Sequence, residues 1–222
     1  MITDNGLGME WIDGTRDPSL GTTIMAVEYE GGVVLAADSR TSTGIYVANR
    51  VSDKITAVAP PFIYCARSGS AADTQMLADL VRRYTTALAL ETKRPATVRT
   101  AAALFRELIY QNKSRLTAGV ICAGWDPSKN GQVYSITLGG TMVRQPFAIG
   151  GSGSTYIYGY CDASYRKGMS RDECIEFCKQ SVSLAMSRDG SSGGVIRMVC
   201  IDETGAKRLV FTDGELPRSW QG

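Results

Sequence analysis

Residues 17–44 read DPSLGTTIMAVEYEGGVVLAADSRTSTG, and this stretch decides the fold. Two apolar runs, 23–30 and 33–39, are joined by a pair of glycines, which is typical of a tight β-hairpin. Before the first run, Gly21 is followed by two threonines. A strand does not require this Gly-Thr-Thr sequence before it, whereas an enzyme whose nucleophile must become its own amino terminus does require such a sequence. The stretch therefore predicts a hairpin that begins at a chemically special threonine.

Further strands and helices are predicted along the rest of the chain. Ser170 and Glu173 have the spacing of a capping box, which supplies partners for first-turn amides, so a helix is expected to begin there. The other predicted helices are 77–88, ending near Pro95, 98–109, and one that opens after the GSGST of 151–155. The predicted strands beyond the first hairpin are 54–58, 62–69, 118–125, 131–139, 141–149, 193–201 and 206–212.

The order of these elements predicts an α+β fold. Strand hairpins, two helices, more hairpins, two helices and a closing hairpin let two antiparallel sheets stack with a helix pair on each outer face. We therefore expect a four-layer αββα sandwich. Residues 1–21 carry four acidic side chains against one arginine, together with turn-forming pairs, and are interpreted as a separable leader. Residues 22–222 are then expected to form a single domain.

The composition narrows the classes of function. The formal net charge of the 222 residues is +2, from interspersed signs, so neither a nucleic acid nor an anionic membrane is expected as a partner. No apolar run approaches the roughly 20 residues that span a bilayer, and the start of the chain lacks the pattern of a secretory signal. We expect a soluble intracellular protein.

Six cysteines are scattered along the chain, without the tight spacing of a metal knuckle or a small disulfide scaffold. They are interpreted as reduced thiols of the core. Cys174 and Cys178 stand four residues apart on a predicted helix, so a structural zinc site remains an alternative there.

The chain contains no histidine. Serine triads, cysteine–histidine pairs and histidine-ligated zinc all need an imidazole, so these chemistries are excluded. A hydrolase with this sequence needs another base near neutral pH. An α-amino group, with an ordinary pKa of about 7.7 to 8.0, is the obvious candidate.

A cut between Gly21 and Thr22 would supply that amino group. The Thr22 hydroxyl would then be a nucleophile whose own amine takes its proton. Asp38 and Lys54 are expected on neighbouring strands, where the ammonium would lower the pKa of the amine. An ordinary ion pair beside an ordinary strand threonine is the structural alternative.

Three other motifs suggest different chemistry. Residues 190–194 match the G-x-S-x-G nucleophile elbow at Ser192, but its histidine partner is missing, and a turn into a strand explains the glycines. Residues 150–155 could cradle a phosphate before a helix, yet they lack the lysine of a P-loop. Residues 164–167 fit S-x-x-K without its companion motifs, so a solvated basic turn is favoured.

Six segments, in order from Gly21 to about Phe211, carry a resemblance to a known family. They are LGTTIMAVEYEGGVVLAADSRTSTG, VANRVSDKI, ARSGSAADTQ, LTAGVICAGWD, GGSGSTYIYGYCD and RDGSSGGVIRMV. Together they resemble the catalytic β subunits of the 20S proteasome, and most nearly the eukaryotic caspase-like (beta-1) type. The resemblance implies the fold of the N-terminal nucleophile hydrolases, and a propeptide, 1–21, removed by self-cleavage to expose Thr22. Two prolines at 60–61 add a residue to one loop, outside these motifs.

The resemblance also implies the catalytic residues. Asp38 and Lys54 match the supporting carboxylate and ammonium, and the Gly69 amide matches the oxyanion donor. Gly21, which has no Cβ, would let the backbone adopt a strained turn from which Thr22 attacks the preceding carbonyl. The remaining polar groups around the threonine would be Ser152, Asp189 and Ser192.

A specificity pocket is implied in the same way. Arg67 matches the floor of the pocket for the residue before the scissile bond, where a guanidinium favours Glu or Asp. An arginine with a purely structural role is the alternative. The other residues implied for this pocket are Thr41, Ser52 and Ala71.

The resemblance thus implies a threonine endopeptidase that cleaves unfolded polypeptides after acidic residues. It implies assembly with other β-type and α-type subunits in a four-ring particle of seven-membered rings, in cytoplasm and nucleus. No metal or organic cofactor is expected, because nucleophile, base and oxyanion donor are all protein groups. Two alternatives are a non-catalytic structural β subunit, disfavoured by the intact cut site, and a bacterial-type two-ring protease, disfavoured by the acidic leader and the specialised pocket.

Overall fold

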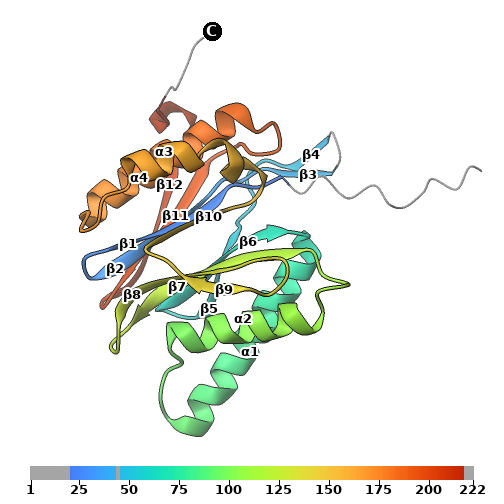
Figure 1. The fold of residues 1–222 in the computed structure, drawn as a ribbon, viewed down its shortest axis with the longest axis vertical. Helices are drawn as coiled ribbons and strands as arrows, with labels where there is room; N and C mark the ends of the chain where they lie inside the picture. Colours follow the sequence, from blue (N-terminus) through green and yellow to red (C-terminus); the bar gives the residue numbers. More distant parts are fainter. Residues whose placement is uncertain (1–20, 44–45, 218–222) are drawn as a thin grey trace, which may run out of the picture.

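The computed structural model describes residues 21–43 and 46–217, and two five-stranded antiparallel sheets lie face to face at its centre (Figure 1). The first sheet has the order β10-β1-β2-β11-β12, with bounds Phe147–Gly150, Ile24–Tyr29, Gly32–Ala37, Ile196–Asp202 and Gly205–Phe211. The second has the order β5-β6-β7-β8-β9, with bounds Ile55–Ala59, Ile63–Gly69, Ala118–Asp126, Asn130–Ile136 and Met142–Arg144.

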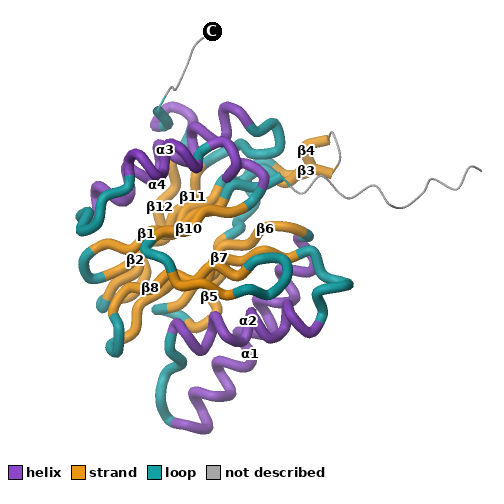
Figure 2. The backbone as a smooth tube through the Cα atoms, viewed as in Figure 1, coloured by secondary structure: helices purple, strands orange, loops and turns teal. Residues whose placement is uncertain are grey.

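A pair of helices covers the outer face of each sheet (Figure 2). The pair over the second sheet is α1 (Ala71–Thr92) and α2 (Val98–Gln111), and the pair over the first is α3 (Tyr158–Ser164) and α4 (Arg171–Arg188). The predicted capping box at Ser170 starts α4. The α+β fold and its four-layer αββα arrangement are therefore confirmed.

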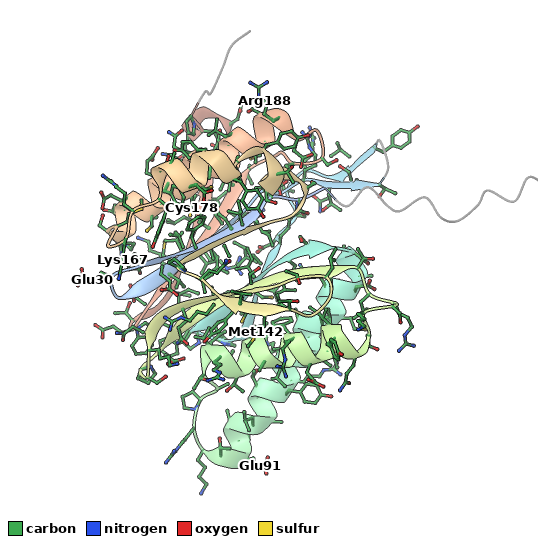
Figure 3. All side chains as sticks on the ribbon, in the orientation of Figure 1. Glu30, Glu91, Met142, Lys167, Cys178 and Arg188 are labelled. Carbon is green, nitrogen blue, oxygen red and sulfur yellow. The ribbon has the colours of Figure 1, made fainter. Side chains whose placement is uncertain are left out.

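Period-two alternation sorts the strand side chains into separate cores. In β2, Val33 and Leu35 pack between the two sheets, whereas Val34 and Ala36 pack beneath α4. A third core lies between the second sheet and its helix pair, around Phe105. Side chains fill all of these layers (Figure 3). Both faces of a central strand such as β2 are buried, so the ends of such a strand are held in place.

One predicted strand is wrong in its extent. The run 141–149 forms two strands, of which β9 pairs with β8 in the second sheet and β10 pairs with β1 in the first. Pro146 separates them, because proline has no amide to continue a ladder. Its carbonyl instead accepts a hydrogen bond from the Glu28 amide at 2.8 Å. The chain therefore crosses between the sheets at this proline.

Two polar residues lie at strand ends, and not on strands as predicted. Asp38 follows β2 directly, and Lys54 immediately precedes β5. A hairpin of β3 (Thr41–Thr43) and β4 (Tyr46–Asn49) lies between them in the sequence. The sequence pattern does not predict this hairpin, because all four residues of β4 are exposed and have no buried face.

All six cysteines are free thiols and buried, as the sequence predicts. Cys178 lies in α4 (Figure 3), and burial raises the pKa of its thiol well above the ordinary value. Within the described residues, no three side chains of the metal-binding types gather, so the pair Cys174 and Cys178 has no third ligand there. No helix in the same part of the chain is long and apolar enough to cross a bilayer. Residues 1–20 of the predicted leader lie outside the described residues.

Candidate active site

Thr22 is buried just before β1, with 5% of its surface exposed. Its hydroxyl donates a hydrogen bond to the Gly21 carbonyl oxygen at 2.6 Å. Its amide donates to Ser152 Oγ at 3.1 Å. The hydroxyl of the predicted nucleophile therefore faces the carbonyl group of the residue before it.

Gly21 fits its place only because it has no side chain. A Cβ at this position would lie 1.7 Å from the Cβ of Ser191. Close packing against Ser191 therefore requires a glycine here, and the strained turn stays a prediction.

A buried ion pair lies beside the threonine. Lys54 Nζ is 2.6 Å from Asp38 Oδ1 and donates a hydrogen bond to Thr22 Oγ1 at 3.1 Å. Asp38 has no exposed surface, and its carboxylate also accepts from the backbone amides of Thr23 at 2.9 Å, Arg40 at 3.1 Å and Gly193 at 2.9 Å. A carboxylate with this many donors is held in one orientation. The pair does more than an ordinary ion pair, because its ammonium also contacts the hydroxyl.

The pKa of Lys54 is lowered from its ordinary value. Burial is the main cause, because it disfavours the charged ammonium, while the charge of Asp38 opposes the shift and that of Arg40 adds to it. An ammonium with a lowered pKa is a better proton donor than an exposed lysine. Lys54 can therefore exchange a proton with the Thr22 hydroxyl nearer to neutral pH than a surface lysine could.

A second polar group lies on the amide side of Thr22. Ser152 and Ser192 both donate hydrogen bonds to Asp189 Oδ2, at 2.7 Å and 2.6 Å. Asp189 is the C-cap residue of α4, and its amide bonds to the last turn of that helix. Because Ser152 also accepts from the Thr22 amide, a single hydroxyl connects Asp189 to the Thr22 nitrogen.

A cavity of about 310 Å³ opens at Thr22. Arg67 lines it, and the guanidinium donates to Thr56 Oγ1 at 3.0 Å, Thr74 Oγ1 at 3.2 Å and the Asp53 carbonyl at 3.0 Å. Within 21–43 and 46–217, no carboxylate forms an ion pair with Arg67. The other predicted residues on the cavity wall are Gly21, Thr41, Ser52, Lys54, Gly69 and Ala71. The predicted pocket residues are thus brought together in one cavity, whose wall also carries the guanidinium of Arg40.

Gly69 ends β6 on the wall of this cavity. Its φ is +99°, and a Cβ would lie 2.2 Å from the Thr117 carbonyl oxygen. A side chain at this position is excluded on both counts, so the backbone itself forms the wall. Gly69 and Thr22 line the same cavity, as is required of an oxyanion donor for an attack by Thr22 on a carbonyl group.

The three competing motifs, at residues 190–194, 150–155 and 164–167, have structural roles. Ser192 gives its proton to Asp189, and no histidine exists to activate it. The Gly153 amide donates to the Thr22 carbonyl at 3.2 Å, which occupies part of the predicted phosphate loop. Lys167 is exposed at the surface (Figure 3), as a solvated basic turn requires.

Thr23 and Arg40 also belong to the site, although no motif in the sequence predicts a role for them. The Thr23 hydroxyl lies 2.8 Å from Ser192 Oγ, and Arg40 Nη1 donates to the Gly190 carbonyl at 2.7 Å. The signal in the sequence is their position, one residue after Thr22 and two after Asp38. Neither position reveals a partner more than 140 residues away.

Comparisons with known proteins find similarity to proteasome subunits. A family model described as proteasome subunit matches residues 19–201, a range that includes every site residue above. Proteasome subunit beta type-6 of Dictyostelium discoideum is 58% identical over 213 residues, covering 96% of this chain and 98% of that protein. Proteasome subunit beta type-1 of Saccharomyces cerevisiae is 54% identical over 197 residues, covering 89% and 91%. Proteasome subunit beta type-9 of Homo sapiens is 52% identical over 198 residues, covering 89% and 90%.

Proposed function

The chain belongs to the proteasome β-subunit family, and on that premise we propose that it is a threonine endopeptidase whose nucleophile is Thr22. One observation carries the proposal. The buried Lys54 ammonium donates a hydrogen bond to Thr22 Oγ1 at 3.1 Å and another to Asp38 Oδ1 at 2.6 Å. An ammonium in this position stabilises negative charge on the threonine oxygen and favours a neutral amine at the adjacent nitrogen.

The proposed first reaction is cleavage of the Gly21–Thr22 peptide bond. The Thr22 oxygen adds to the Gly21 carbonyl carbon, the hydroxyl proton passes to the Thr22 nitrogen, and the carbon–nitrogen bond breaks. The product is an ester of Gly21 on Thr22 Oγ1. Water then hydrolyses the ester, so that the leader, 1–21, leaves as a carboxylic acid and the Thr22 hydroxyl is restored. The contact of 2.6 Å between hydroxyl and carbonyl supports this step.

The freed amine is the proposed base for peptide hydrolysis. Thr22 Oγ1 attacks the carbonyl carbon of the substrate and its proton goes to the amine, while the Gly69 amide donates to the oxyanion. The proton passes to the leaving nitrogen as the peptide bond breaks, which leaves an acyl ester on Thr22. Water hydrolyses this ester and regenerates the hydroxyl. The contact from Ser152 holds the nitrogen in place through both steps.

The proposed preference for Glu or Asp before the scissile bond rests on Arg67. A guanidinium has five N–H donors, and three hydrogen bonds to neutral oxygens hold this one in the cavity. Its charge and remaining donors can therefore serve a substrate carboxylate. The three contacts also fit a structural role, and a substitution of Arg67 distinguishes the two roles by its effect on the preference for Glu.

As a member of this family, the chain assembles with other proteasome subunits. We propose that 22–222 is the mature single-domain subunit of a four-ring particle with seven subunits in each ring. The proposed substrates are unfolded polypeptides, and the proposed compartments are cytoplasm and nucleus.

The experiment that tests the proposal measures the intact mass of this subunit in assembled particles, together with hydrolysis of a peptide ending in Glu. The wild-type chain is expected to start at Thr22. Thr22→Ala should keep the leader and abolish the hydrolysis, while Thr86→Ala, at an exposed helical threonine, should change neither. A wild-type subunit that still starts at Met1 in finished particles would identify a non-catalytic subunit. Hydrolysis by the Thr22→Ala subunit would remove the nucleophile assignment.

A further inference from the structure

Thr23, the residue after the proposed nucleophile, contacts both polar groups of the site. It has no exposed surface. Its amide donates a hydrogen bond to Asp38 Oδ1 at 2.9 Å, the same oxygen that binds the Lys54 ammonium. Its hydroxyl lies 2.8 Å from Ser192 Oγ, on the side of Asp189. Thr23 is therefore joined to the lysine side of Thr22 through its backbone and to the amine side through its side chain.

The chemistry of the partners sets the direction of the hydrogen bond between Thr23 and Ser192. A carboxylate only accepts, so the hydroxyl of Ser192 uses its single proton for Asp189 Oδ2, at 2.6 Å. Ser192 Oγ is then the acceptor, and the Thr23 hydroxyl is the donor. Ser152 likewise gives its proton to Asp189 and accepts from the Thr22 nitrogen. The hydrogen bonds donated by the Thr23 hydroxyl and by the Thr22 nitrogen thus each lead, through one serine hydroxyl, to the carboxylate of Asp189.

The space around the Thr23 hydroxyl is closed. A Cβ on Gly153 would lie 1.9 Å from Thr23 Oγ1 and 3.0 Å from Ser192 Oγ. The backbone at Gly153 thus lies against the two hydroxyls, and neither Thr23 nor Ser192 has any exposed surface. Loss of the Thr23 hydroxyl would leave Ser192 Oγ without its donor.

We propose that Thr23 is a positioning residue that keeps the pKa of the Thr22 amine near neutral pH, an inference that rests on the proposed function. Donation from Thr23 polarises the Ser192 hydroxyl and strengthens its hydrogen bond to Asp189. Asp189 Oδ2 accepts from both Ser192 and Ser152, so a stronger hydrogen bond from Ser192 leaves less of its negative charge for the one from Ser152. Asp189 then pulls less strongly, through Ser152, on the proton of the amine. The amine loses its proton at a lower pH and is available as a base.

The test measures kcat/KM against pH for a peptide ending in Glu, with assembled particles that carry Thr23→Val or Thr23→Ser in this subunit. Thr23→Val keeps the shape and removes the hydroxyl, and it should move the acid limb of the profile upward by roughly half a pH unit. Thr23→Ser restores the hydroxyl and should follow the wild-type profile. A wild-type profile for Thr23→Val would overturn the proposal. So would a shift shared by both variants, because it would assign the effect to the methyl group.

A double substitution tests whether Thr23 acts through Ser192. The acid limb of Ser192→Ala combined with Thr23→Val should coincide with that of Ser192→Ala alone, since no acceptor remains. Additive shifts would overturn the proposed route. If Thr23→Val particles do not assemble, Thr23→Cys, whose thiol is a weaker donor, should give a smaller upward shift, and an unshifted profile would again overturn the proposal.

Failure of the proposed function has a different signature. In that case the wild-type subunit lacks a Thr22 amino terminus, or Thr22→Ala remains active. The inference about Thr23 fails instead in particles whose wild-type subunit starts at Thr22 and is active, but whose pH profile does not respond to the Thr23 hydroxyl.

Discussion

Two cavities of this molecule differ in what lines them. The larger, about 800 Å³, is formed by the β5–β6 turn, the end of α1, residues 94–97 before α2, and the β7–β8 turn, and apolar side chains such as Phe62 and Trp125 dominate its wall. The smaller, about 310 Å³, lies at Thr22 and contains the ammonium of Lys54 and the guanidinium of Arg67. Volume therefore does not mark the place for chemistry. A nucleophile, neighbouring charges and a backbone donor gather in the smaller cavity alone of these two.

Charged groups are used differently in the two cavities. In the larger one, the Asp126 carboxylate accepts from the amide of Val98 at 3.0 Å, the amide group of Gln132 at 2.7 Å and the Ser128 hydroxyl. Burial alone would raise the pKa of Asp126, but these hydrogen bonds outweigh it and lower the pKa. Asp126 thus holds the start of α2 and the β7–β8 turn. In the smaller cavity, Lys54 instead directs a donor at a hydroxyl that can react.

Lys54→Met should have the largest effect, because it removes the charge that acts on Thr22 Oγ1. We expect kcat/KM for a peptide ending in Glu to fall by about 10³ or more, the scale of a positioned proton-transfer group. The leader should also remain attached, which intact mass measures. Lys167→Met, at an exposed lysine, is the matched control. Activity of Lys54→Met within tenfold of wild type would contradict the role of the ion pair.

Gly21→Ala should act on the cut and not on the mature site. The added Cβ would displace the Gly21 carbonyl from Thr22, because Ser191 occupies its space. A displacement of this kind can slow a reaction by about 10²-fold. A time course of leader removal checks this, with Gly139→Ala, where a Cβ meets nothing within 4 Å, as the control. Equal rates for the two variants would argue against a role for close packing at Gly21.

Arg67→Met should change the choice of substrate. Loss of a charge-assisted hydrogen bond to the substrate should lower kcat/KM for a peptide ending in Glu by about 10- to 100-fold relative to one ending in Leu. Leader removal should be spared. Arg94→Met, at the wall of the larger cavity, should leave the preference unchanged. An unchanged Glu-to-Leu ratio in Arg67→Met would support the structural role of this arginine.

Asp126→Asn should have the smallest effect on catalysis, with kcat/KM unchanged. At pH 7 we expect a loss of about 1.5 to 3 kcal/mol in the free energy of unfolding, the scale for hydrogen bonds to a charged group. The folded pKa of Asp126 is below its unfolded value, so its stabilisation is present above the unfolded pKa and is lost as pH falls through the folded pKa. Urea unfolding of the subunit at pH 7 and below about pH 3.9 measures both values. A difference between wild type and variant that does not shrink in acid would refute the electrostatic account.

Much of the fold could be predicted from sequence because each buried strand carries its own pattern of apolar side chains. Apolar side chains along β2 alternate between two cores, and the spacing of Ser170 and Glu173 marks the start of α4. The exchange of sheets at Pro146 could not be predicted, since it depends on which strands lie beside the two halves of one run. The exposed β4 hairpin has no core face, so burial leaves no pattern in its sequence.

The residues of the site likewise fall into those that the sequence suggests and those that it does not. The absence of histidine and the pair Gly21 and Thr22 suggest an amino-terminal nucleophile from residue types alone. The roles of Ser152 and Asp189 came from resemblance, because contacts across 130 residues leave no spacing to read. The contact of Thr23 with Ser192 spans 169 residues and becomes visible only once the sheets are assembled.

The central claim is that the Thr22 nitrogen acts as the base only after it is released from its peptide bond. The most direct measurement compares assembled particles in which this subunit starts at Thr22 with a free amine or with an acetylated amine, using a peptide that ends in Glu. The account predicts that acetylation lowers kcat/KM by about 10³ or more, although the Thr22 hydroxyl, Lys54 and Asp38 remain in place. Equal rates for the two forms would contradict it.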